Sequence, residues 1–147
     1  MEFIHVSNTE AIEVFPELME MLQDHADEVT GFPGERLDPD WGRYQNLVDL
    51  DIGVVVLAMD GDKIVGYTVN ILTRHLHYNF IVSFNDVIYL KPGYRGHAIK
   101  LLRATEKALK MKGAKYFTLP VKPHLDYGPL LKRFKYELFE YTYKRRL

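Results

Sequence analysis

The segment from Ile81 to Val121 constrains the fold more than any other, because it has the pattern of strand, turn, helix and strand. Ile81–Leu90 is an apolar strand that ends at Lys91-Pro92-Gly93. A helix with one apolar stripe follows and ends at Gly113, and Tyr116–Val121 is the second strand. Such a unit predicts two parallel strands joined by a right-handed helical crossover.

A β-hairpin is predicted immediately before this unit. Ile52–Met59 is a β-branched apolar run, and Lys63–Thr73 is the matching strand. Asp60-Gly61 between them is typical of a tight hairpin turn. These two strands are therefore expected to pair antiparallel.

The N-terminal third has a helical pattern after one short strand, Phe3–Val6. Ser7 or Asn8 is the expected N-cap of a helix that runs to about His25. A second helix is expected to end near Leu50, with Asp38 as its cap and Pro39 at its first position.

The C-terminal part predicts a short helix, Asp126–Phe134, and a final strand, Tyr136–Tyr143. The element order is therefore β-α-α-β-β-β-α-β-α-β. This order predicts an α/β (α+β) fold, with one mixed central sheet and helices on both faces. The whole chain, residues 1–147, is expected to form a single domain. Because this last strand is expected at the edge of the sheet and is rich in aromatic residues, we expect it to pair with a second copy in a homodimer.

Composition limits the classes of function. The formal net charge is −1, which argues against a protein that coats nucleic acid or an anionic membrane. The chain has no cysteine, so disulfides, thiolate catalysis and cysteine-bound zinc are excluded. It shows neither a secretory signal pattern nor an apolar run long enough to span a bilayer. We expect a cytoplasmic protein without a metal site.

The turn and helix start at Tyr94–Leu102 form the first candidate site. A strand that passes through a glycine-containing turn into a helix leaves backbone N–H groups that attract an anion. Gly93 and Gly96 permit close approach, and Arg95 adds positive charge. The spacing matches neither a Walker loop nor the dinucleotide fingerprint. An ordinary strand-to-helix turn is the alternative.

These residues resemble the GNAT acetyltransferase superfamily, whose pyrophosphate loop has the pattern Gln/Arg-x-x-Gly-x-Gly/Ala. Leu90-Lys91-Pro92 is similar to the family's approach to that loop, and Tyr94-Arg95-Gly96 looks like its Tyr-Arg-Gly. Two registers are open, one starting the motif at Arg95 and one placing Gly-x-Ala at Gly96–Ala98. The second register keeps the helix phase and is preferred.

The resemblance implies that acetyl-CoA binds here and that the backbone N–H near Leu90 contacts the thioester carbonyl. It implies these cofactor-binding residues: Leu90, Arg95, Gly96, His97, Ala98 and Ile99. Gly128–Glu137 resembles the family's late helix-to-strand stretch, but Leu131 stands where the family's usual tyrosine acts as an acid. Tyr127, one helical turn earlier, is the substitute candidate, and its alternative role is packing.

A base is needed to deprotonate an amine acceptor. Strand parity places Asp86 on one face with Val82, Phe84, Ile88 and Leu90, where apolar surroundings would favour proton uptake. Its alternative role is to support a β-bulge. His75 and His77, near the end of their strand, are further catalytic candidates or ordinary surface histidines.

Asn85-Asp86, the segment His75–Tyr78 and the segment Pro120–Pro123 also resemble a GNAT-like subgroup that bacteriophages encode. The resemblance as a whole implies an acetyl-CoA-dependent N-acetyltransferase that transfers the acetyl group directly to an amine. The sequence does not identify that acceptor. The alternatives are a non-catalytic module that still binds acyl-CoA, and an interaction protein that kept only the fold.

Overall fold

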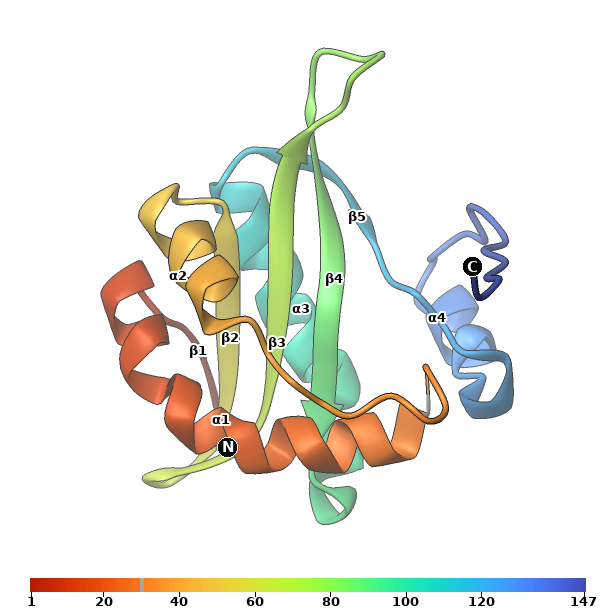
Figure 1. The fold of residues 1–147 in the computed structure, drawn as a ribbon. Helices are drawn as coiled ribbons and strands as arrows, with labels where there is room; N and C mark the ends of the chain where they lie inside the picture. Colours follow the sequence, from red (N-terminus) through yellow and green to blue (C-terminus); the bar gives the residue numbers. More distant parts are fainter. Residues whose placement is uncertain (30) are drawn as a thin grey trace.

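The computed structural model describes residues 1–29 and 31–147 as a five-stranded sheet with helices on both faces (Figure 1). The strand order is β1-β2-β3-β4-β5. The strands are β1 (Glu2–His5), β2 (Gly53–Asp60), β3 (Lys63–Arg74), β4 (Ile81–Leu90) and β5 (Ala114–Thr118). The α-helices are α1 (Asn8–Val29), α2 (Trp41–Asp49), α3 (Ala98–Met111) and α4 (Gly128–Arg133). Two 3-10 turns, η1 (Pro92–His97) and η2 (Pro123–Leu125), complete the described elements.

The predicted hairpin and crossover are both present. β2 and β3 pair antiparallel around a turn in which Gly61 has a φ of +59°, a conformation that glycine adopts without strain. β3 and β4 also pair antiparallel, whereas β4 and β5 pair parallel with α3 between them in the chain. The predicted fold class is therefore confirmed.

Successive side chains of each strand point to opposite faces of the sheet, so the apolar side chains form two separate cores. On one face, α1 and α2 cover a core that includes Leu57, Tyr67 and Val87. On the other face, α3 covers a core that includes Val54, Val56 and Leu101. Figure 1 shows the same arrangement, with α1 and α2 in front of the sheet and α3 behind it. Because both faces of β2 are buried, its sequence is a continuous apolar run.

The helix starts follow local capping chemistry. Ser7 and Glu10 form a capping box, in which the Ser7 N–H donates to the Glu10 carboxylate at 2.7 Å and the Glu10 N–H donates to Ser7 Oγ at 3.3 Å. The predicted cap of the second helix was wrong by two residues. Asp40, rather than Asp38, accepts the N–H of Arg43 at 3.1 Å, so Pro39 precedes the helix.

The predicted final strand is absent from the described structure, where residues 134–147 contain no helix or strand. The alternating pattern of this segment provides a strand-like sequence but no partner strand, because β5 ends at Thr118 after only five residues. Leu138, Phe139, Tyr141 and Tyr143 are all exposed. The end of the chain instead contacts the connection between α1 and α2, through Lys144 and Arg146.

Candidate active site

A cavity of about 1040 Å³ opens where β5 separates from β4. The paired residues of these strands end at Phe84 and Thr118, so the second half of β4 has no strand partner on that side. The cavity is lined by the end of α1, the segment after it, the second half of β4, the start of α3, and residues between Pro120 and Leu130. The separation of two parallel strands therefore creates this cavity.

The free edge of β4 presents backbone groups to this cavity. The N–H of Lys91 donates to the carbonyl of Val65 on β3 at 2.9 Å. Since successive amides of a strand point to opposite edges, the N–H of Leu90 points away from β3 and toward the cavity that Leu90 lines. This orientation suits the carbonyl contact that the sequence resemblance implies for Leu90.

A β-bulge at Asp86 changes the predicted parity of β4. Val69 pairs with Val87 and Asn70 pairs with Asn85, which leaves Asp86 as the extra residue. The Asn85 side-chain amide donates to the carbonyls of Val69 at 3.3 Å and Val87 at 2.8 Å, so it supports the bulge.

Asp86 consequently keeps only part of its predicted surroundings. Ile88 and Leu90 were placed on its face by simple alternation, which was wrong, because both pack in the core beneath α3. Asp86 instead faces α2, and it is exposed rather than enclosed by apolar side chains. The bulge therefore turns the carboxylate toward an open space.

Asp86 is held by Tyr44, which sequence reasoning missed. The Tyr44 hydroxyl donates to the Asp86 carboxylate at 3.0 Å. Burial, followed by the neighbouring Asp86 charge, raises the pKa of Tyr44 well above its usual value, so this hydroxyl stays protonated. A second cavity, of about 400 Å³, lies beside α2, and both residues line it as well as the larger cavity. The Tyr44–Asp86 pair thus stands where the two cavities meet.

His25 is a second residue that the sequence analysis missed. It lies on α1, lines the larger cavity, and has its ring 6.0 Å from the ring of Tyr89 in an edge-on arrangement. Burial is the main cause that lowers the pKa of His25, while the nearby charges of Glu28 and Asp86 oppose that shift. A neutral imidazole near a carboxylate can accept a proton, so His25 has the chemistry of a base. His25 lies three residues after the partly buried Leu22, which is helical spacing for the same face of α1. This spacing is the sequence signal that could have identified His25.

The predicted phosphate turn is the 3-10 turn η1, which leads directly into α3. The N–H of Tyr94 donates to the carbonyl of Lys91 at 2.8 Å, and the N–H of Ala98 donates to the carbonyl of Arg95. The Arg95 guanidinium forms an ion pair with Glu28 on α1. Two of the predicted anion donors, the Ala98 N–H and the Arg95 side chain, therefore already have partners within the chain.

The other predicted phosphate contacts surround this turn. A side chain added at Gly93 or Gly96 would meet no atom within 4 Å, so the backbone here is open to approach. The Nδ1 atom of His97 is buried without a hydrogen-bond partner in the described part of the chain. Ile99 lies in the first turn of α3, where helix N–H groups point outward.

Tyr127 lies in the wall of the larger cavity, at the start of α4. Its hydroxyl donates to the carbonyl of Pro120 at 3.1 Å, and burial raises its pKa. Leu131 is buried and packs inward. Tyr127 is thus a hydroxyl donor placed in the cavity wall, and a ligand that used it would have to compete with Pro120.

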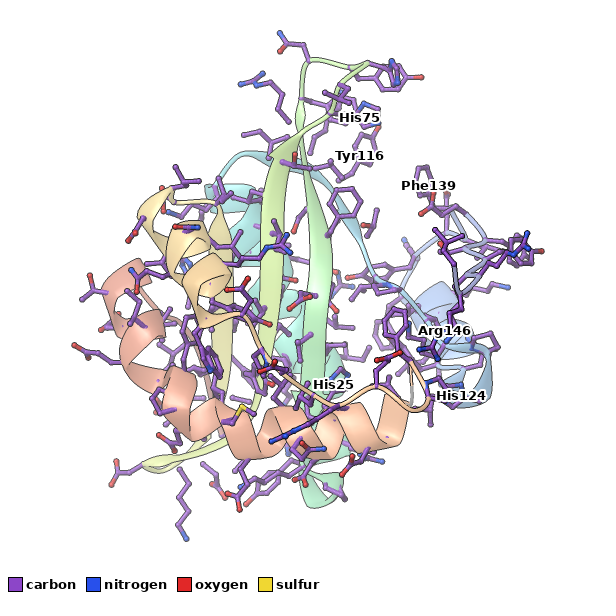
Figure 2. All side chains as sticks on the ribbon, viewed as in Figure 1. His25, His75, Tyr116, His124, Phe139 and Arg146 are labelled. Atoms are coloured by element: carbon purple, nitrogen blue, oxygen red, sulfur yellow. The ribbon has the colours of Figure 1, made fainter. Side chains whose placement is uncertain are left out.

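His75 and His77 are not brought together with Asp86. They lie beyond the end of β3, in an aromatic cluster at the tip of the β3–β4 hairpin, where the rings of His75 and Tyr78 are 4.9 Å apart. Figure 2 shows His75 at the opposite end of the sheet from His25. Neither histidine lines the two cavities. Their predicted catalytic role stays a prediction.

Residues 1–29 and 31–147 contain neither a metal-binding cluster nor a membrane-spanning helix. No group of three or more His, Cys, Asp or Glu side chains there could hold a metal ion. Over the same residues, no helix has the length and apolar character that crossing a bilayer requires.

Solved structures share this fold over nearly the whole chain, although no protein-family model and no curated protein matches the sequence. An aminoglycoside acetyltransferase from an uncultured soil metagenomic sample, crystallised with sisomicin, has a TM-score of 0.72 at 16% identity, covering 99% of this chain and 96% of its own. The ribosomal-protein-alanine N-acetyltransferase of Brucella melitensis biovar Abortus 2308 has a TM-score of 0.72 at 14% identity, and each chain covers 100% of the other.

A third similar structure has no activity in its description. It is an integron cassette protein from the mobile metagenome of Cole Harbour Salt Marsh, with a TM-score of 0.73 at 19% identity, covering 99% of this chain and 89% of its own. At these identities the similarity establishes the architecture alone. The chain has the fold of the GNAT acetyltransferases.

Proposed function

We propose that this protein is an acetyl-CoA-dependent N-acetyltransferase that transfers the acetyl group directly to an amine. The observation that carries the proposal is the Tyr44–Asp86 pair, which lines both the large cavity along β4 and the smaller one beside α2. A donor held along β4 and an amine that approaches from the side of α2 and of the segment after α1 would meet at this carboxylate. Two similar folds belong to an aminoglycoside acetyltransferase and a ribosomal-protein-alanine N-acetyltransferase, which supports the proposal.

The larger cavity has features that suit coenzyme A. Its volume, about 1040 Å³, is at the upper end of the range typical of small-molecule pockets. The pantetheine arm of coenzyme A carries two amide groups, and the edge of β4 offers backbone groups that can pair with them. Arg95, Gly96, His97, Ala98 and Ile99 lie around the turn where the pyrophosphate would sit.

The chemistry assigned to the protein has three parts. Asp86 takes the proton of the ammonium acceptor, and Tyr44 holds the carboxylate by its hydrogen bond. The N–H of Leu90 donates to the carbonyl oxygen as negative charge develops on it. Tyr127 supplies a proton to the departing thiolate, since Leu131 has none to give. His25, also in the cavity wall, is the second candidate base.

The alternative is a protein that binds acyl-CoA without turnover. The leucine at position 131 favours it, because a leucine cannot supply the proton that the enzyme would give to the departing thiolate. Isothermal titration with acetyl-CoA tests both candidates. The absence of binding at millimolar coenzyme would overturn both.

A second experiment distinguishes the enzyme from the binding module. A panel of amines is mixed with acetyl-CoA, and the release of free thiol is followed. Acceptor-dependent thiol release supports the enzyme. Coenzyme binding with no release for any member of a broad panel supports the binding module.

A further inference from the structure

A sharp turn directly after α1 presents an aromatic ring and a carboxylate side by side. Phe32, Pro33, Gly34 and Glu35 form this turn, and the N–H of Glu35 donates to the carbonyl of Phe32 at 3.1 Å. Gly34 has a φ of +85°. Proline followed by a glycine of positive φ is the signature of a type II turn. The geometry of Phe32 and Glu35 is therefore set locally, before any ligand arrives.

The end of the same chain occupies this turn with two positive charges. The Lys144 ammonium donates to the carbonyl of Gly31 and lies 5.0 Å from the centre of the Phe32 ring. The Arg146 guanidinium lies 3.3 Å from the Glu35 carboxylate. Figure 2 shows Arg146 beside the connection that carries the turn. A carbonyl, an aromatic face and a carboxylate are together the groups that recognise organic cations.

The turn also belongs to the wall of the larger cavity. Gly31, Phe32 and Glu35 all line it. The charged residues of that lining are six acids (Asp27, Glu28, Glu35, Asp38, Asp86 and Asp126) and three bases (Arg36, Arg95 and Lys122). The lining therefore carries three more acids than bases. The excess lies on the side of the turn, because residues 27–38 supply four of these acids and one of the bases. A ligand with several positive charges would therefore be attracted to this side of the cavity.

We propose that Gly31, Phe32 and Glu35 form a binding subsite for a polyamine-like acceptor with at least two cationic groups, and that Lys144 and Arg146 occupy it in the free protein. The assignment rests on the proposed function, because it describes the part of the acceptor that does not react. A cationic ligand can displace Lys144 and Arg146 from this subsite. Both members of the Arg146–Glu35 pair are highly exposed, and exposed ion pairs hold weakly.

Spermidine binding, measured by isothermal titration at low ionic strength without acetyl-CoA, tests the subsite. The variant Lys144→Ala/Arg146→Ala removes the occupant, and Lys132→Ala/Arg145→Ala removes two other positive charges from the same C-terminal region. No side-chain hydrogen bond or ion pair holds Lys132 or Arg145 within the described residues. Thermal melts establish that all variants are folded.

The first variant should bind spermidine roughly three- to tenfold more tightly than the parent chain, and the charge-matched control should not. Adding Phe32→Ala or Glu35→Gln to the first variant should remove the gain. Equal spermidine affinity in the parent and the first variant, or an equal gain in affinity in the control, would overturn the proposed subsite. Acetyl-CoA binding is titrated separately, so its absence would count against the proposed function while leaving the spermidine result intact.

Discussion

Tyr44 on α2 and Asp86 on β4 are joined by a hydrogen bond of 3.0 Å although 42 positions separate them in the chain. The bond ties the helix that covers the sheet to the bulge in the strand beneath it. It also fixes one oxygen of a carboxylate that borders two cavities. The remaining oxygen is the one available to an incoming amine.

Replacing Asp86 with Asn should therefore lower kcat by a factor on the order of 100 to 10,000, the range that a general base usually contributes. The amide keeps the size of the side chain but cannot take the proton. The measurement is thiol release at saturating acceptor, with acetyl-CoA affinity followed by titration. Tyr44→Phe, which keeps the ring and loses the hydroxyl, should have a smaller effect. An unchanged kcat in Asp86→Asn would end the assignment of this residue as the base.

His25 should make the folded protein less stable as the pH falls. Burial lowers its pKa, so the folded protein takes up a proton less readily than the unfolded chain does. The stability that neutral His25 contributes is present above its pKa in the unfolded chain, about 6.5. This stability is lost as the pH falls through the lower pKa of His25 in the folded protein. The melting temperature of His25→Gln should fall less steeply between pH 7 and pH 5 than that of the parent.

His124→Gln is the matched control for this pH series, because His124 is exposed. The pKa of His5 is also lowered, by partial desolvation of its ring and then by the nearby Lys112 charge, so His5→Gln should reduce the slope in the same direction. Identical slopes in the parent, His25→Gln and His5→Gln would contradict the assigned direction.

Local sequence patterns predict most of the architecture, because hairpins, crossovers and helix caps depend on neighbouring residues. Asp60-Gly61 and the segment Ile81–Val121 are two such cases, and the structure contains the elements that they predict. The prediction of a final strand is wrong for the opposite reason. Residues 136–143 alternate as a strand does, but a strand also needs a partner edge, which no local pattern reports.

The site is less predictable than the fold, since contacts across the sheet create it. Asp86 was found from its chemistry, but its orientation depends on a bulge that the Asn85 amide supports through carbonyls on two strands. Tyr44 has no sequence signal that links it to Asp86. His25 had one, because it continues the inward stripe of α1 through Leu18 and Leu22.

Releasing Arg95 from Glu28 should strengthen coenzyme binding. The ion pair engages the guanidinium that the phosphate turn would otherwise offer. Glu28→Gln should therefore lower the Kd for acetyl-CoA a few-fold, while Arg95→Ala should raise it. Asp27→Asn removes the same charge one residue away and should change the Kd less. Titration calorimetry checks all three, and a weaker coenzyme complex in Glu28→Gln would contradict the role of Arg95.

Removing the Tyr67 hydroxyl should stabilise the protein. Tyr67 is buried, and its hydroxyl has no hydrogen-bond partner among the described residues. A buried polar group left without a partner costs about 1 to 3 kcal/mol, so Tyr67→Phe should raise the free energy of unfolding by about 1 kcal/mol at pH 7. Urea unfolding measures the difference. A destabilised variant would show that the hydroxyl is satisfied in solution.

The same substitution should change the response to alkaline pH. Burial, followed by the charges of Tyr44, Asp86 and Tyr89, raises the pKa of Tyr67 above its usual value. The unfolded chain ionises first, near pH 10, so the folded state loses stability as the pH rises above that value. Tyr67→Phe should lose less stability than the parent between pH 9 and pH 11. Parallel curves for the two proteins would contradict the shift.

Gly66 should be indispensable for the end of β4 that carries Leu90. A Cβ atom at position 66 would lie 2.5 Å from Leu90 Cδ2 and 2.5 Å from the carbonyl oxygen of Tyr89, and the second of these is backbone that cannot rotate away. Gly66→Ala should therefore lower the free energy of unfolding by about 1 to 3 kcal/mol, as overpacking usually does. It should also weaken acetyl-CoA binding, because relief of the clash displaces the Leu90 N–H. For the unfolding measurement, Gly93→Ala is the matched control, since a Cβ there meets nothing within 4 Å. Equal unfolding free energies for the two variants would show that β3 and β4 approach each other less closely at Gly66 than described.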